Sequence, residues 1–471
     1  MKEKYRYLSK NVLLFSLNGF VPKIFIFILI PIYTRYLSTA EYGISDLINT
    51  TALLLVPIFT LDIQDAVMRF ALDKNYPNRD VFSTGIHILL RGTFLVALGC
   101  SLLACLHLPG VKNIYLVFIA IMFFTMSCNN MFSLFCRGID KVKIIAVSSI
   151  INSAITLFAN ILFLICFHWK LVGYLTANTI GAFVSLIYIF FRAPLYPYIC
   201  LHPSIQIKKE MVAFSFPLIF SVVAWWVNNV SDRYILTWMS GVSVSGIYAV
   251  AYKIPNMLTT FQNVFTQAWS ISAVKEFDRN DSDGFIGNTY RLMDYAMVLL
   301  CSLIMIMNMP IAYFLYAQDF FEAWKYVPPL LLSVLFNAMA LFIGSIFTAV
   351  KDTKTLAVST VVGAVVNTVC NFVFIYYWKA YGAAIATMVA YLTVFLMRRI
   401  FLRKYIRLKT DFRSGLITYI LLLVQMIIAN LGWKSIPIQF VLLFFIIWLH
   451  KCETITIVDA VRHKIIKKQA P

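Results

Sequence analysis

The chain has 471 residues, of which 61% are hydrophobic, 16% are aromatic and only 13% are charged. A soluble globular domain is close to half apolar and about a quarter charged. This composition therefore excludes a soluble enzyme, a secreted disulfide scaffold and a disordered protein, and it indicates a polytopic membrane protein. The chain also carries 40 Lys and Arg residues against 21 Asp and Glu residues, a formal net charge of +19, so the positions of the cations carry further information.

The sequence predicts an all-α fold, because long apolar segments recur along the whole chain. A spanning helix needs about 20 mainly apolar residues, and that window predicts about fourteen transmembrane helices. The last segment is short, and a shallow hairpin with its neighbour would leave twelve spans as the alternative. The predicted spans are 11–33, 44–61, 83–106, 113–135, 144–167, 171–191, 212–238, 245–271, 292–315, 326–349, 355–377, 382–402, 414–431 and 436–450.

The basic residues alternate from connector to connector. Of the 40 Lys and Arg residues, 30 fall in the two tails, in every second connector and at the adjoining span end that holds Arg398 and Arg399, six in the other connectors and four deeper inside spans. Cytoplasmic segments of membrane proteins carry an excess of Lys and Arg. The split therefore predicts an even number of spans, with both the N-terminus and the C-terminus in the cytoplasm.

Two short motifs recur in the two halves of the chain. Residues 35–37 read Arg-Tyr-Leu and precede Tyr-Gly-Ile at 42–44, while residues 233–235 read Arg-Tyr-Ile and precede Ser-Gly-Ile-Tyr at 245–248. Both motifs lie near the outer end of the first predicted span of a half. They predict two six-helix lobes related by a pseudo-two-fold axis along the membrane normal, a repeat that occurs in transporters.

A proline-containing connector at 192–211 is the natural boundary between these halves. The predicted N-terminal lobe is 1–197 with the first six spans. The predicted C-terminal lobe is 198–408, which holds the connector's second part and spans seven to twelve. Residues 409–471 would form an appended pair of helices and a basic cytoplasmic tail.

Four cations lie inside predicted spans, namely Lys23, Arg91, Arg233 and Lys253. An ionisable side chain at bilayer depth costs about 2.5–3.5 kcal/mol on insertion scales and usually faces a cavity or a partner. Snorkelling to the nearest membrane surface is the alternative for Arg91 and Arg233. A cavity lined by all four cations would bind an anionic substrate.

Prolines accompany two of these cations. Pro22 precedes Lys23, and Pro255 follows Lys253 by two residues. Proline removes a backbone hydrogen bond from a spanning helix and permits a bend. A bend beside a cation is a candidate gate element.

Polar residues in or near the spans are candidates for a polar cavity lining or for ion coupling. A solvated helix end is the alternative for Asp62 and Asp65, and an ion pair with Arg233 is the alternative for Asp232. The amides have the alternative of bonding between helices without touching substrate. The candidates are Asp46, Asn49, Asp62, Asp65, Asp232, Asn256 and Asn263.

No motif for chemistry accompanies these residues. The sequence has no phosphate-cradling GxxxxGK[ST], no nucleophile elbow and no metal-ligand set. The predicted connectors are also too short to hold a catalytic domain. The sequence therefore predicts a protein that is not an enzyme, with no metal and no cofactor.

Residues 31–43, 231–236 and 246–253 resemble the corresponding segments of Wzx-type polysaccharide flippases. These flippases belong to the multidrug/oligosaccharidyl-lipid/polysaccharide (MOP) exporter superfamily. The resemblance implies two six-span lobes around a central cavity that opens alternately to each side of the bacterial inner membrane. It implies that undecaprenyl-diphosphate-linked oligosaccharide is flipped from the inner to the outer leaflet for capsule or O-antigen synthesis. The appended helix pair resembles that of the lipid II flippase branch, where it helps to form a lipid groove.

The resemblance leaves energy source and partners as further expectations. With no ATPase motif, an H⁺ or Na⁺ gradient is the expected source of energy. The expected partners are the bilayer, the lipid-linked substrate and a polysaccharide polymerase, with no nucleic acid. A cation-coupled multidrug exporter of the same fold is the first alternative, although cations outnumber carboxylates in the spans. A membrane-embedded polymerase or ligase is the second, and it would need a large external loop.

Overall fold

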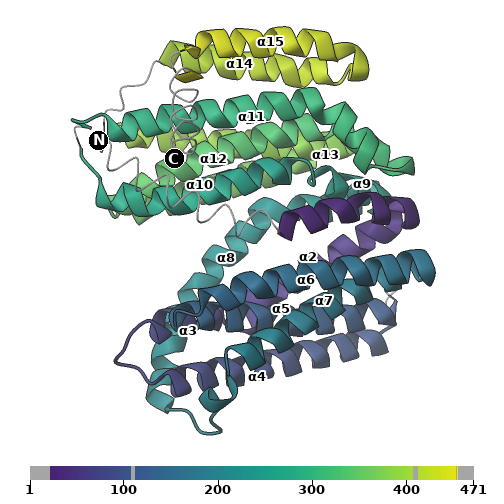
Figure 1. The fold of residues 1–471 in the computed structure, drawn as a ribbon, viewed down its shortest axis with the longest axis vertical. Coiled ribbons are helices and arrows are strands. Elements are labelled where there is room, and N and C mark those ends of the chain that lie inside the picture. Colours follow the sequence, from purple (N-terminus) through teal and green to yellow (C-terminus); the bar gives the residue numbers. More distant parts are fainter. Residues whose placement is uncertain (1–21, 108–111, 280, 407–411, 452, 455–471) are drawn as a thin grey trace, which may run out of the picture. The chain divides into compact units, whose positions relative to one another are not determined.

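The computed structural model describes residues 22–107, 112–279, 281–406, 412–451 and 453–454. Over these residues the fold is built from helices, with no strand, so the all-α prediction is confirmed (Figure 1). The elements in chain order are α2 (Thr39–Phe59), α3 (Ile63–Ala71), α4 (Asn78–Cys105), α5 (Asn113–Gly138), α6 (Val142–Asn160), η1 (Ile161–Cys166), α7 (Lys170–Arg192), η2 (Tyr196–Tyr198), α8 (Ile205–Ser240), α9 (Val242–Ala251), α10 (Pro255–Lys275), α11 (Phe285–Leu315), η3 (Gln318–Lys325), α12 (Val327–Ala349), α13 (Thr353–Leu402), α14 (Phe412–Ala429), η4 (Gly432–Ser435) and α15 (Ile436–Leu449).

Within the described part of the chain, ten helices are long and apolar enough to cross a membrane. The predicted spans 355–377 and 382–402 both fall in α13, which is interrupted at Lys379 (φ 48°, ψ −128°). Residues 11–21 of the predicted span 11–33, about half of it, lie outside the described residues. The total of fourteen spans therefore stays a prediction, whereas the multi-pass helical architecture stands.

The chain forms two compact units. One contains residues 20–246 and the other residues 247–471, so the division falls inside α9. The lobe boundaries expected from the connector at 192–211, with units of 1–197, 198–408 and 409–471, stay predictions. Each unit is described by itself below.

The core of the first unit is aromatic and close-packed. Phe82 on α4 packs against Phe135 on α5 with tilted rings whose centroids are 4.6 Å apart, and Tyr198 meets Phe135 edge to face at 5.2 Å. Small residues allow the helix backbones to approach, as is usual between helices in a membrane. A Cβ on Gly85 of α4 would reach the Met131 sulfur of α5 at 2.8 Å. These contacts hold α3, α4 and α5 as one rigid support for α2 and α8.

The start of α2 is fixed by a capping box. The Ser38 hydroxyl accepts the backbone N–H of Glu41 at 3.2 Å, and the Ser38 N–H donates to the Glu41 carboxylate at 2.8 Å. This reciprocal arrangement satisfies two backbone donors at a helix N-terminus. The helix therefore begins at Thr39, four residues before the glycine of the first repeat motif.

The glycines of the two repeat motifs pack against each other. A Cβ on Gly246 would collide with the carbonyl oxygen of Thr39 and would lie 2.9 Å from the backbone nitrogen of Gly43. A Cβ on Gly43 would in turn collide with the carbonyl oxygen of Val242. Neither position has room for a side chain, so the first turns of α2 and α9 approach backbone to backbone. The two repeat motifs therefore contact each other through their glycines, Gly43 and Gly246.

One predicted span is interrupted, and another ends where it was expected to end. The span predicted at 44–61 corresponds to α2, and a separate helix, α3, follows it before the span predicted at 83–106. Leu61 and Asp62 both take left-handed φ values, 54° and 49°, and break the helix there. The span predicted at 245–271 is divided into α9 and α10 around Lys253, because Pro255 occupies the first turn of α10. The second break is the bend expected beside Lys253.

The second unit packs around α12, whose side chains are largely buried. Trp269 of α10 stacks on Phe342 of α12 with centroids 4.2 Å apart, and its indole N–H donates to the Phe342 carbonyl at 3.1 Å. The α14–α15 hairpin lies against α11 (Figure 1). Gln425 of α14 accepts the Ser302 hydroxyl of α11 at 2.8 Å, so a polar bond fixes the register of the appended pair.

The glycine contact yields a stability prediction. We expect Gly246→Ala to lower the free energy of unfolding by about 1–3 kcal/mol, because the added methyl group overpacks a backbone contact. Gly99→Ala is the matched control, since a Cβ there meets no atom within 4 Å. Thermal unfolding in detergent, followed by tryptophan fluorescence, measures both variants. Equal unfolding temperatures for Gly246→Ala and Gly99→Ala would contradict the close approach.

Candidate functional site

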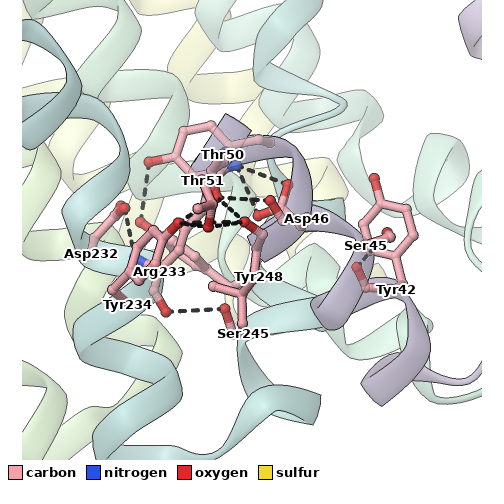
Figure 2. A network of polar contacts seen from close by, with 12 residues as sticks. Tyr42, Ser45, Asp46, Thr50, Thr51, Asp232, Arg233, Tyr234, Ser245 and Tyr248 are labelled. Atoms are coloured by element: carbon pink, nitrogen blue, oxygen red, sulfur yellow. Dashed lines mark hydrogen bonds and ion pairs between the residues drawn. The ribbon is translucent and has the colours of Figure 1, made fainter. Parts of the chain in front are cut away.

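A polar seam joins α2 to α8 inside the first unit. Asp46 and Thr50 are four residues apart and therefore share one face of α2, and Thr51 follows Thr50. Figure 2 shows these side chains facing Arg233 and Tyr234 of α8. Asp46 lies seven residues into α2 and Arg233 lies seven residues before the end of α8, roughly 10 Å from a helix end in each case at 1.5 Å per residue.

The seam is centred on an ion pair. One guanidinium nitrogen of Arg233, Nη1, lies 2.9 Å from both carboxylate oxygens of Asp46. Each side chain is only 15% exposed, so the pair is largely removed from water. Removing one partner of such a pair leaves an uncompensated charge and costs about 3–5 kcal/mol in fully buried cases. The pair therefore fixes α2 against α8 and compensates two charges that would otherwise be costly in the membrane.

Neutral hydrogen bonds extend the seam toward the middle of α2. The Tyr234 hydroxyl lies 2.7 Å from the Thr51 hydroxyl and 3.3 Å from that of Thr50. The Trp226 indole N–H donates to the Thr50 carbonyl at 3.0 Å. Trp226 and Tyr234 also pack ring against ring at 5.3 Å. The sequence did not identify Tyr234 as the partner of Thr50 and Thr51.

Asp232 lies beside Arg233 and has a different role. Its side chain is 2% exposed, and one carboxylate oxygen accepts the backbone N–H of Arg233 at 2.9 Å. The guanidinium of Arg233 contacts Asp46. An ion pair between Asp232 and Arg233 stays a prediction.

Asp62 occupies the break between α2 and α3. It is 3% exposed, and its Oδ1 accepts the Gln64 amide at 2.6 Å, while Gln64 also accepts the Thr60 hydroxyl at 3.0 Å. Its Oδ2 is buried without a hydrogen-bond partner among the described residues. Burial, with a smaller effect of the Asp65 carboxylate, raises the pKa of Asp62 to about 6. Burial also raises the pKa of Asp65.

The other candidates of the first unit are spread over it. Lys23 is exposed on the helix described from residue 22 onward, and Arg91 is exposed on α4. Asn49 is half-buried on α2, three residues from Asp46. The structure thus brings Arg233 together with Asp46, and it leaves Lys23 and Arg91 outside that pair.

The remaining three candidates belong to the second unit. Lys253 is half-buried in the turn between α9 and α10. Asn256 and Asn263 are both exposed on α10, seven residues apart and therefore on one helix face, as predicted. A single cavity shared by all four cations of the sequence stays a prediction.

One buried cation was missed. Arg398 had been counted among the connector cations, but it lies inside α13 and is 7% exposed. Its guanidinium donates to the Ser359 hydroxyl at 3.0 Å, to the Ala340 carbonyl at 2.8 Å and to the Thr360 hydroxyl at 3.1 Å. Every guanidinium nitrogen therefore has an acceptor. Its burial could have been suspected from its position, because it lies four residues before the end of the predicted span 382–402.

The described residues hold no cluster of three His, Cys, Asp or Glu side chains that would suit a metal ion. Among the described residues, the buried polar candidates lie at two places. One is the polar seam of α2 and α8, and the other is the Asp62 carboxylate at the break between α2 and α3. Neither carries a nucleophile with an adjacent base. What this arrangement provides is charge recognition and a charge-dependent helix contact.

Comparison with known proteins gives a family and a fold. The model of the polysaccharide biosynthesis protein family matches residues 8–271, more than half of the chain. No curated protein sequence matches the chain significantly. Solved structures match over most of the chain, but at identities that show the fold alone.

Three of these structures illustrate the fold. The lipid II flippase MurJ, in an inward closed conformation, matches with a TM-score of 0.68 and 16% identity over 95% of this chain and 100% of that chain. A MATE transporter of Vibrio cholerae matches with a TM-score of 0.60 and 11% identity, over 86% of this chain and 97% of that chain. A MOP superfamily transporter from Pyrococcus furiosus matches with a TM-score of 0.58 and 13% identity, over 86% and 97%.

The superfamily expected from the sequence motifs is thereby confirmed. The matched segment includes both repeat motifs, α2, α8 and the Arg233–Asp46 pair. The solved structures that share the fold are named as transporters and a flippase. The chain belongs to the polysaccharide biosynthesis protein family and has the multi-pass helical fold of the MOP superfamily.

Proposed function

We propose that the protein flips undecaprenyl-diphosphate-linked oligosaccharide from the inner to the outer leaflet of the bacterial inner membrane. The observation that carries this proposal is membership of the polysaccharide biosynthesis family together with a fold similar to that of a lipid II flippase. The product would be a capsule-type or O-antigen-type glycan. A polysaccharide polymerase is the class of enzyme that would consume the flipped unit.

Charge supports an anionic substrate over a cationic drug. The first unit carries Lys23, Arg91 and Arg233 at positions predicted to lie within spans. A diphosphate carries several negative charges and is recognised by Arg and Lys through charge-assisted hydrogen bonds. A MATE-type exporter of cationic drugs would be served by the opposite balance.

The proposal predicts the effect of removing the protein from its own cell. Lipid-linked repeat units should continue to be made and should accumulate in the inner leaflet. In spheroplasts, a membrane-impermeant glycosidase should leave them intact, whereas it should cleave those of normal cells. Unchanged glycan export after depletion, or loss of drug resistance as the main effect, would contradict the proposed function.

The Arg233–Asp46 pair suits a latch in alternating access. In the described conformation the pair joins α2 to α8. A diphosphate near the Arg233 guanidinium would compete with the Asp46 carboxylate for the same donor. We infer that substrate binding opens the pair and loosens α2 from α8, which would couple occupancy to movement of these helices.

A double-mutant cycle tests this latch. Arg233→Ala and Asp46→Ala should each lower the free energy of unfolding by up to about 3 kcal/mol, because each change strands the other charge of the pair; the double variant strands neither and should lose no more than either single variant. The exposed pair Arg69–Asp73, at 4.0 Å, is the control, and its removal should cost about 0–0.5 kcal/mol.

Glycan export in cells tests whether Arg233 binds substrate or only holds α2 against α8. If Arg233 also binds the diphosphate, Arg233→Ala should abolish glycan export, while Asp46→Ala should retain part of it. Both variants should be compared at equal protein levels in the membrane. Equal export in Arg233→Ala and Asp46→Ala cells would contradict substrate binding by Arg233, and additive stability losses would contradict the latch.

For energy coupling, we propose that a proton binds Asp62. Three carboxylates of the first unit differ in surroundings: Asp46 is ion-paired, Asp232 accepts a backbone N–H, and Asp62 has one buried oxygen without a partner among the described residues. A buried carboxylate of that kind favours the protonated form. Its position at the break between α2 and α3 links its charge to a helix junction. The notion of Na⁺ coupling loses support here, since a single carboxylate does not make an ion cage.

The sign of the pH effect follows from the raised pKa. The folded state holds the Asp62 proton more tightly than an unfolded chain with the ordinary value of 3.8. Stability from this group is therefore present at low pH and is lost as the pH rises through about 6. Asp62→Asn mimics the protonated form. Its unfolding temperature should match the wild type below about pH 3.8, exceed it increasingly as the pH rises to about 6, and stay above it near pH 8.

Asp140→Asn is the control for this experiment, because Asp140 is exposed and also has a left-handed φ of 59°. Its unfolding temperature should follow the wild type at every pH. In vesicles, Asp62→Asn should also lose stimulation of flipping by an imposed pH gradient. A constant difference between Asp62→Asn and wild type across the pH range would contradict titration of this carboxylate.

A further inference from the structure

A groove follows the first turns of α8, in a region that the proposed function has not used. Its volume is about 550 Å³, within the usual range for ligand sites of about 300–1,000 Å³. The spacing of its lining residues by three and four places them on one helix face. They are Ile205, Lys208, Lys209, Val212, Ala213, Phe216 and Pro217.

The groove has a cationic end and an apolar end. Lys208 and Lys209 lie in the first turn of α8, within the connector predicted to be cytoplasmic. Phe216 and Pro217 lie about two turns further along, roughly 10 Å away at 1.5 Å per residue. Phe216 is 51% exposed. A lipid whose phosphate meets the lysines would lay its chain along the apolar end.

More positive charge surrounds the lysines. His87 on α4 is within electrostatic reach of Arg91, Lys208 and His202. None of the salt bridges among the described residues involves Lys208, Lys209 or Arg91. Several cationic or titratable groups therefore converge where the connector enters α8. Such a concentration fits a ligand with more than one negative charge better than a single phosphodiester.

The acidic residue nearest in sequence is held away from the groove. Glu210 accepts the Tyr76 hydroxyl at 2.8 Å and the Gln206 amide at 2.7 Å. Met211 and Ser215, one turn apart, are fully buried on the core side of α8. The core-facing side of the helix is thus occupied, while the groove side presents lysines and exposed apolar residues.

We propose that this groove binds the diphosphate headgroup and the first isoprene units of a polyprenyl diphosphate at the inner membrane surface. This inference rests on the proposed function and deepens it, because it assigns a receiving site for the lipid carrier before transport. Lys208 and Lys209 bind the diphosphate oxygens, with Arg91 adding to the local positive potential. The apolar end contacts the isoprenoid chain.

A binding experiment on the full chain in detergent tests the site, with farnesyl diphosphate as the probe. Replacing Lys208→Gln and Lys209→Gln together should weaken binding by at least about tenfold, since charge-assisted bonds are lost. The control is the double variant Lys74→Gln and Lys143→Gln, which removes the same charge from two exposed lysines of the same unit. Its affinity should stay within about twofold of wild type.

Two further probes separate the ends of the groove. Phe216→Ser should weaken farnesyl diphosphate and leave the weaker binding of inorganic pyrophosphate unchanged, because pyrophosphate has no chain. Vesicles of phosphatidylglycerol should compete poorly. Equal competition by phosphatidylglycerol would overturn a diphosphate site in favour of general attraction to anionic lipid. Equal loss in both lysine double variants would overturn a site at Lys208 and Lys209.

Flipping in vesicles distinguishes failure of this inference from failure of the proposed function. Wild-type protein that flips lipid-linked oligosaccharide, with an unchanged apparent KM in the Lys208→Gln, Lys209→Gln variant, would overturn the receiving site and leave the function standing. Wild-type protein that fails to flip would overturn the function itself. The expected result is a raised KM with little change in the maximal rate, since the lysines act before translocation.

Discussion

The cost of placing a charge in an apolar membrane governs much of this structure. A side chain that is charged at bilayer depth needs a partner or a wet surface, and the two buried arginines meet that need differently. Arg233 is neutralised by the Asp46 carboxylate. Arg398 has three uncharged oxygen acceptors, one for each guanidinium nitrogen. The first arrangement responds to a competing anion, whereas the second is a fixed support for α12 and α13.

The close contact of Gly43 with the first turn of α9 gives the ion pair its geometry. Asp46 follows Gly43 by less than one helical turn, so the backbone approach at the glycine places the Asp46 carboxylate on the seam. Ser245, beside Gly246, donates to the Arg233 carbonyl at 3.2 Å. The repeat motifs therefore combine a steric requirement with an electrostatic one. A movement that separates α2 from α8 must overcome both.

The sequence was informative where chemistry depends on composition and local pattern. Long apolar runs predicted an all-α membrane protein, and the segments around Arg35 and Arg233 identified the superfamily. Pro255 predicted the bend beside Lys253. The left-handed pair Leu61–Asp62 could not be predicted in the same way, because neither residue type requires that conformation and tertiary packing imposes it. The contact of Arg233 with Asp46 also depends on which faces of α2 and α8 meet, and the sequence does not show that.

The same limit applies to Lys208 and Lys209. From the sequence, these two lysines only indicated the topology of a connector. The structure adds that they share one face of α8 with Phe216 and line a groove there. Positive charge near the inner surface can therefore serve two purposes at once. It orients the chain during insertion, and it gathers anionic lipid near the helix that carries Arg233.

The central claim is translocation of a lipid-diphosphate-linked oligosaccharide by this chain. The most direct measurement reconstitutes the purified protein in vesicles that contain the lipid-linked oligosaccharide in both leaflets, with a glycosidase added outside. We predict that the wild-type protein makes the protected inner pool accessible to the glycosidase. The Arg233→Ala variant should leave this pool protected. Cleavage that stops at the outer pool, as in protein-free vesicles, would contradict the account.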